Sequence, residues 1–174
     1  RMSKRDGYHH FLGIAIMQLA PRVNDAAAIS AKYEIPTMQA ANCVICHKSM
    51  DPVAGLFQDY YALDGKGVHK LREEGWFEDM FSPGHEGEAL PEDERWRALQ
   101  WLGERTVKDP RFAVAMVEHV WYILPGRKAL RPPEDIDAPF YSATQRSYSE
   151  QRGEIEAIAR RFAAANFNLK NVFK

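Results

Sequence analysis

The stretch Cys43-Val44-Ile45-Cys46-His47 constrains this chain more than any other part of its sequence. Two cysteines separated by two residues and followed directly by histidine form the attachment signature of c-type haem. On one helical turn, the two thiols can form thioether bonds to the two vinyl groups of one porphyrin, and the next imidazole can reach the iron from the same side. The motif therefore predicts that Cys43 and Cys46 hold a single haem c covalently and that His47 is an axial ligand of its iron.

Two other uses of this motif stay open, a zinc site and a redox dithiol. Zinc needs four ligands, but the chain contains only two cysteines, and the separations of His69 and His85 from His47 follow no zinc pattern. A thioredoxin-like dithiol follows a buried strand and opens a helix, whereas the preceding Met-Gln-Ala-Ala-Asn at 38–42 has no β-branched alternation. The sequence favours haem over both.

The composition is that of a globular protein. The chain has 174 residues, of which 45% are hydrophobic and 27% charged, and this is enough for one domain with a real core. A formal net charge of -1 provides no chain-wide field for nucleic acid. The longest apolar run, Phe11 to Met17, is far shorter than the roughly 20 residues that span a bilayer. We therefore expect no nucleic-acid binding and no membrane span.

Apolar residues recur at helical spacing in most of the chain, which predicts an all-α fold. We expect helices over Tyr8–Leu19, Ala26–Tyr33, a short haem helix from Thr37 or Asn42 to Pro52, Glu92–Val107, Pro110 to Pro125, and Glu154–Ala165. Trp96 is expected to face inward from the fourth of these helices. Between the helices, Gly75–Pro91 reads as a long loop and Arg131–Ser149 as an extended surface excursion. No segment of useful length shows the alternation of apolar and polar residues that is typical of a β-strand.

The residues around the haem motif resemble the haem-binding part of large exported c-type cytochromes of planctomycetes and proteobacteria. The likeness is carried by Cys-x-x-Cys-His-x-x-Met-Asp-Pro at 43–52, Asp-Pro-Arg-Phe at 109–112 with Gly-Arg at 126–127, Ile-Ala-Arg-Arg-Phe at 158–162 and Asn-Phe-Asn-Leu at 166–169. The chain departs from the family where Gly55 stands one residue late, where Gln-Asp-Tyr at 58–60 replaces an acidic turn, and at Pro125.

The resemblance implies a cytochrome c-like helical core around one covalent haem, with Cys43, Cys46 and His47 as its attachment and ligation residues. We expect one haem-binding domain over 1–174, with N-terminal helices in 1–35, the haem core in 36–130 and a C-terminal excursion and helix in 131–174. Family domains of this kind lie inside longer chains, so we also expect a piece of a longer polypeptide. Thioether attachment takes place outside the bacterial cytoplasm, which implies a periplasmic or otherwise exported protein.

The second axial ligand decides what such a haem does. A Met thioether raises the reduction potential, a second His lowers it, and an open position permits chemistry on small molecules. Met50 should not reach across, because on a helix it lies on the same face as His47. Met80, in the long loop, is our preferred ligand, with an ordinary core methionine as the alternative. The other candidates are Met116, His119, His69 and His85.

We therefore expect a mono-haem cytochrome that carries one electron to a redox partner protein or to neighbouring domains. Two alternatives stay open: a haem enzyme or sensor whose open distal site acts on peroxide or a diatomic ligand, and a structural module stapled by haem. A carrier is favoured over a catalyst because the sequence shows no paired carboxylates, nucleophile–base arrangement or phosphate loop. Leu56, Phe57, Tyr60 and Tyr61 supply area of the sort that walls a porphyrin.

Overall fold

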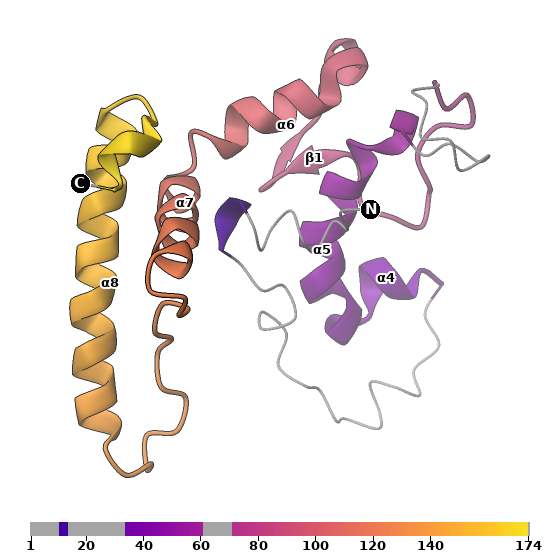
Figure 1. Cartoon of the computed structure of the whole chain (residues 1–174). Coiled ribbons are helices and arrows are strands. Elements are labelled where there is room, and N and C mark those ends of the chain that lie inside the picture. Colours follow the sequence, from indigo (N-terminus) through magenta and orange to yellow (C-terminus); the bar gives the residue numbers. More distant parts are fainter. Residues whose placement is uncertain (1–10, 14–33, 61–70, 174) are drawn as a thin grey trace. The chain divides into compact units, whose positions relative to one another are not determined.

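The computed structural model describes residues 11–13, 34–60 and 71–173, and its chain falls into two compact units (Figure 1). The described residues from 34 to Thr106 belong to the first unit, and Phe11–Gly13 together with the residues from Val107 onward belong to the second. The division at 106–107 falls inside the segment 36–130 that the sequence assigns to the haem core. A single haem-binding domain over 1–174 stays a prediction.

The first unit is mostly helical. Its described residues form α4 (Pro36–Gln39), α5 (Ala41–Gly55), the 3₁₀ turn η1 (Gln58–Tyr60), the strands β1 (Gly84–His85) and β2 (Glu88–Ala89), the 3₁₀ helix η2 (Glu92–Arg97) and α6 (Ala98–Thr106). The second unit contains α7 (Pro110–Ile123), α8 (Tyr141–Ala164) and the 3₁₀ turn η3 (Leu169–Asn171). The predicted all-α class is confirmed.

Helix α5 carries the haem motif and is longer than predicted. The sequence placed its end at Pro52, but the helix continues to Gly55 with Pro52 inside it. Proline removes one backbone donor from a helix, here the N–H that would bond to the carbonyl of Lys48. The following turn is nevertheless stabilised by burial, because Val53, Ala54 and Leu56 are all shielded from solvent.

The predicted N-caps of the haem helix were also wrong. The N-cap positions of α4 and α5 are Ile35 and Ala40, and neither side chain makes a capping hydrogen bond. Thr37 lies inside α4 and donates its hydroxyl to the carbonyl of Asp79, at 2.5 Å. Thr37 therefore ties α4 to the loop that follows residue 71 instead of capping a helix.

A small hairpin lies in the predicted long loop and packs against α5. Strands β1 and β2 pair antiparallel, with Gly84 opposite Ala89 and His85 opposite Glu88. The two turn residues, Glu86 and Gly87, have φ angles of 49° and 87°, as a type I′ turn requires. Strands of two residues are too short to show alternation of apolar and polar side chains, so no sequence pattern predicts them.

Two glycines permit close backbone contacts here: Gly55 lets α5 lie against Pro83, and Gly84 lets the two strands of the hairpin lie close together. An ideal Cβ built on Gly55 would lie 2.6 Å from Cγ of Pro83, and one built on Gly84 would lie 2.2 Å from the carbonyl oxygen of Glu88. Real Cβ atoms do not tolerate such distances, so neither position has room for a side chain. Arg105 of α6 then binds the far strand through an ion pair with Glu88, with Nη2 2.5 Å from Oε1.

The buried cluster of the first unit forms around Trp101. Leu56, Ala98 and Trp101 make up the cluster, and Trp101 is only 1% exposed. The prediction that Trp96 faces inward was wrong, because its side chain is 73% exposed. Residues 92–97 form a 3₁₀ helix with three residues per turn. The α-helical phase therefore starts only at Ala98, which places Ala98 and Trp101 on the inner face.

A buried ion pair holds the start of the loop that leads to Met80. Asp59 is 4% exposed and accepts hydrogen bonds from Nε and Nη2 of Arg95, at 3.0 and 2.6 Å. The backbone N–H of Arg72 also donates to Asp59, at 2.8 Å, while Nη2 of Arg95 donates to the carbonyl of Arg72, at 2.8 Å. The hydrogen bond and charge of Asp59 raise the pKa of Arg95. The pair thus fixes both backbone polar groups of Arg72.

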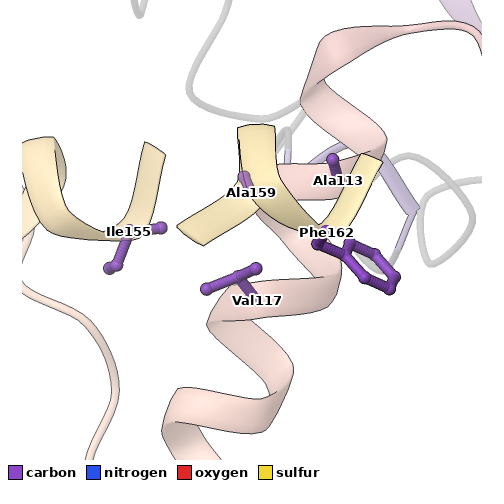
Figure 2. Close-up of a cluster of buried hydrophobic side chains, with 5 residues drawn as sticks. All are labelled: Ala113, Val117, Ile155, Ala159 and Phe162. Carbon is purple, nitrogen blue, oxygen red and sulfur yellow. The ribbon is translucent and has the colours of Figure 1, made fainter. Parts of the chain in front are cut away.

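The second unit is built on the packing of α7 against α8. Figure 2 shows its buried side chains between the two helices: Ala113, Val117, Ile155, Ala159 and Phe162. The predicted bounds of α7 are confirmed, since Pro110 occupies its first turn and the side chain of Asp109 accepts from the N–H of Arg111 at 2.9 Å. Ile123, the last residue of α7, is 69% exposed.

Helix α8 begins at Tyr141, whereas the sequence predicted a surface excursion up to Ser149 and a helix only from Glu154. Residues 141–153 are almost entirely polar, so this solvated first half has no apolar period to detect. The second half overlaps the predicted helix Glu154–Ala165 and buries Ile155, Ala159 and Phe162, at 1%, 3% and 2% exposure. No helix among the described residues has the length and apolarity needed to cross a membrane.

Of the helix predicted over Tyr8–Leu19, the structure describes only Phe11–Gly13. Gly13 has a φ of 67°, a left-handed conformation that interrupts a helix at this point. An ideal Cβ on Gly13 would lie 3.9 Å from Cβ of Ala115, so Gly13 lies close to α7. The helix predicted over Ala26–Tyr33 lies outside the described residues.

Candidate haem-attachment site

The residues predicted to attach haem occupy one face of α5. Cys46 and His47 follow Cys43 by three and four positions, a spacing that places side chains on the same side of a helix. All three are half-buried, which leaves part of each side chain accessible. Both cysteines carry free thiols. The helix alone therefore brings together two thiols and an imidazole.

A buried carboxylate holds the imidazole of this face. Nδ1 of His47 lies 2.9 Å from each of the two carboxylate oxygens of Asp51, one helical turn further on. The side chain of Asp51 is 5% exposed and that of His47 is 29% exposed. An ionised carboxylate can only accept hydrogen bonds, so Nδ1 of His47 is the donor and the lone pair of a neutral ring lies on Nε2.

This arrangement fits a covalently bound haem. Axial ligation needs an imidazole whose ligating nitrogen is unprotonated, and metal-bound histidines usually donate their other ring N–H to a carboxylate or carbonyl. The His47–Asp51 pair supplies both features, and the two free thiols for thioether formation lie just before it in α5, Cys46 directly before His47 and Cys43 one turn earlier. The donor set of α5 is therefore suited to one iron ligand and two covalent attachments.

The zinc alternative requires a cluster of ligands that haem does not. In 11–13, 34–60 and 71–173, no three His, Cys, Asp or Glu side chains gather in a way that could hold a metal ion. A haem iron takes four ligands from the porphyrin itself, so the protein has to provide only axial groups. The geometry of the described part of the chain is consistent with haem and gives zinc no further ligand.

Met80, the preferred second axial ligand, is half-buried in the loop that leads to β1. Within this loop, Nε1 of Trp76 donates to the carbonyl of Phe81 at 2.9 Å, and the guanidinium of Arg72 lies 4.0 Å from the ring centre of Phe77. The bond from Thr37 to the carbonyl of Asp79 connects the loop to α4, and α4 packs on α5. The residue before Met80 is therefore anchored to a helix that contacts the one carrying the haem motif.

The other candidate ligands occupy different surroundings. Met116 and His119 lie on α7 in the second unit, where Met116 packs against the buried cluster. His85 lies in β1 of the first unit and is 6% exposed. His69 lies outside the described residues. Met80 as the ligand stays a prediction.

Two of the residues expected to wall the porphyrin serve the protein core. Leu56 is 1% exposed and packs with Ala98 and Trp101, and Phe57 packs against the same cluster. Almost no surface of Leu56 is left for another group to contact. Tyr60 is half-buried, and Tyr61 lies outside the described residues.

Asp51 is the residue of this candidate site that sequence reasoning missed. It stands in the quoted Met-Asp-Pro of the motif, yet we assigned it no role. The available signal was its position four residues after His47, because on one helix such a pair lies within hydrogen-bonding reach. Both residues lie within the helix predicted up to Pro52, so the rule already applied to them.

Comparison of the chain with family models, with curated proteins and with solved structures gave no significant match. The resemblance to exported cytochromes therefore depends on the quoted residues alone.

Proposed function

We propose that this chain is a mono-haem c-type cytochrome domain that carries one electron. The observation that supports this best is the single face of α5 on which Cys43, Cys46 and a carboxylate-held His47 lie together. Haem supplies the one-electron couple when bound. The chain's own residues attach the ring at two points and present one imidazole to the iron.

The attachment suits electron transfer because it limits movement. Two thioether bonds and an axial ligand on one helix restrain the ring on one side, and the buried Asp51 restrains the imidazole itself. Such a site changes little in geometry when the charge of the iron changes. We further propose Met80 as the second axial ligand, because the loop that carries it is fixed to α4 at Asp79.

The same chemistry defines a compartment and a kind of partner. Bacterial thioether attachment takes place outside the cytoplasm, so we propose a periplasmic or otherwise exported location. A one-electron carrier needs a donor and an acceptor, and we propose that these are a redox partner protein or neighbouring domains.

Spectra of the haem-loaded chain, expressed with the haem attachment machinery, test this function. We expect a low-spin spectrum with the near-infrared band of Met-to-iron ligation and no response to carbon monoxide. Met80→Ala should abolish the band and make the ferrous form bind carbon monoxide, whereas Met116→Leu, a nearly volume-conserving control in a packing position, should leave the band unchanged. A band that survives Met80→Ala would overturn the ligand assignment.

The His47–Asp51 pair also supports a second candidate, a haem enzyme or sensor. A carboxylate bonded to Nδ1 increases electron donation through the imidazole, and strong donation from the proximal side favours O–O cleavage in haem enzymes. Carbon monoxide separates the two candidates. A response of the unsubstituted protein would favour the enzyme or sensor over the carrier.

A further inference from the structure

We propose that Asp51 is a positioning residue that keeps the Nε2 lone pair of His47 directed at the iron and lowers the reduction potential of the haem. The potential part of this inference rests on the proposed function. Asp51 lies outside the Cys-x-x-Cys-His motif. Its negative charge and its capacity to accept a hydrogen bond have distinct roles in this proposal.

The burial of Asp51 distinguishes this pair from an ordinary surface contact. Exposed i,i+4 pairs on helices stabilise little, but the Asp51 side chain is only 5% exposed. A buried carboxylate is costly unless polar groups compensate it. Both of its oxygens lie 2.9 Å from Nδ1 of His47, so the imidazole N–H compensates this charge.

The first consequence is a fixed tautomer and ring orientation. A neutral imidazole carries its proton on either nitrogen, and only the form with the proton on Nδ1 leaves Nε2 able to bind iron. Asp51 selects that form because it accepts from Nδ1. The preceding turn of α5 carries both thiols. One rigid helix therefore determines both the orientation of the imidazole ring and the positions at which the porphyrin is attached.

The second consequence concerns charge. A carboxylate next to the axial ligand stabilises the ferric state more than the ferrous state, because the ferric iron carries one more positive charge. Burial weakens screening by solvent and salt, so the effect persists at physiological ionic strength. Asp51 should therefore hold the potential below the value that the same ligands would give with a neutral acceptor at this position.

Two substitutions separate these roles in the haem-loaded chain. Asn at position 51 can still accept from Nδ1 but carries no charge. Asp51→Asn should therefore keep the haem content and the low-spin spectrum, while the reduced-to-oxidised ratio at a fixed ambient potential rises about tenfold, which corresponds to roughly 59 mV for one electron. Asp51→Ala removes the acceptor as well, so its haem content or His-ligated fraction should fall several-fold.

Asp93→Asn provides the matched control. Asp93 is exposed on η2 of the same unit, so the substitution removes the same charge at a solvated position and should shift the ratio less than twofold. A shift below twofold in Asp51→Asn, or an equal shift in Asp93→Asn, would overturn the inference while leaving the cytochrome proposal intact. Loss of haem from Asp51→Asn would also overturn it, since Asn retains the acceptor. Unsubstituted protein that attaches no haem would overturn both proposals.

Discussion

Replacing Arg95 by Met should destabilise the first unit strongly, although Arg95 lies far in sequence from the haem motif. The substitution keeps the aliphatic stem and removes two hydrogen bonds to Asp59, at 3.0 and 2.6 Å, and one to the carbonyl of Arg72. Breaking a buried ion pair typically costs about 3–5 kcal/mol. Because the Arg95 side chain is 27% exposed, we expect a smaller loss, about 2–3 kcal/mol, in the free energy of unfolding.

Urea denaturation followed by circular dichroism measures this loss. Arg97→Met, on the same 3₁₀ helix, is the control: Arg97 is as exposed as Arg95, but its partners Glu94 and Glu104 are 31% and 47% exposed where Asp59 is 5% exposed. Removing Arg97 therefore leaves no buried unpaired charge and should shift the midpoint little. Combining Arg95→Met with Asp59→Asn should recover part of the stability, because no unpaired charge is then buried. A loss below about 1 kcal/mol, or a double variant no more stable than Arg95→Met, would refute the reasoning.

Two further pairs of variants test the packing of the first unit. Gly55→Ala should lower the free energy of unfolding by about 1–3 kcal/mol because its Cβ would meet Pro83, whereas Gly103→Ala, in a helical position with open space around it, should raise it by up to about 1 kcal/mol. Trp101→Ala should cost about 3–5 kcal/mol, whereas Trp96→Ala should cost little because that side chain is 73% exposed. Thermal and urea unfolding check both pairs, and equal effects within either pair would contradict the packing described here.

Sequence patterns predicted the helical class and several elements well. Helix α7 starts where Asp109 and Pro110 provide a cap and a first-turn proline, and its stop before Pro125 and Gly126 follows the same chemistry. The inward stripe of α8 was visible because Ile155, Ala159 and Phe162 recur at helical spacing. Both signals come from residues close together in the sequence, so they can be recognised without knowledge of tertiary contacts.

The patterns failed where tertiary contacts decide the structure. Pro52 would end an isolated helix, but the burial of Val53, Ala54 and Leu56 stabilises one more turn. The 3₁₀ geometry before Ala98 shifts the helical phase, so Trp101 and not Trp96 faces the core. The polar first half of α8 and the two-residue strands lack any apolar period, and no reading of hydrophobicity could have revealed them.

The candidate site was predictable to a different degree at each residue. The Cys-x-x-Cys-His spacing alone specified the three side chains that share a face of α5, and the structure places them there. The i,i+4 spacing of His47 and Asp51 was readable inside the predicted helix, but the spacing alone does not show that the Asp51 carboxylate is buried. The second axial ligand involves a loop whose path is set by long-range bonds such as that from Thr37 to Asp79, so Met80 stays a prediction.

The central claim is the covalent attachment of one haem through Cys43 and Cys46. It is tested most directly by the intact mass of the denatured chain after expression with the periplasmic haem attachment machinery. We predict the mass of the polypeptide plus one haem, and a Cys43→Ala/Cys46→Ala variant with the mass of the polypeptide alone. An unmodified mass for the unsubstituted chain, or haem retained by the double variant, would contradict the account.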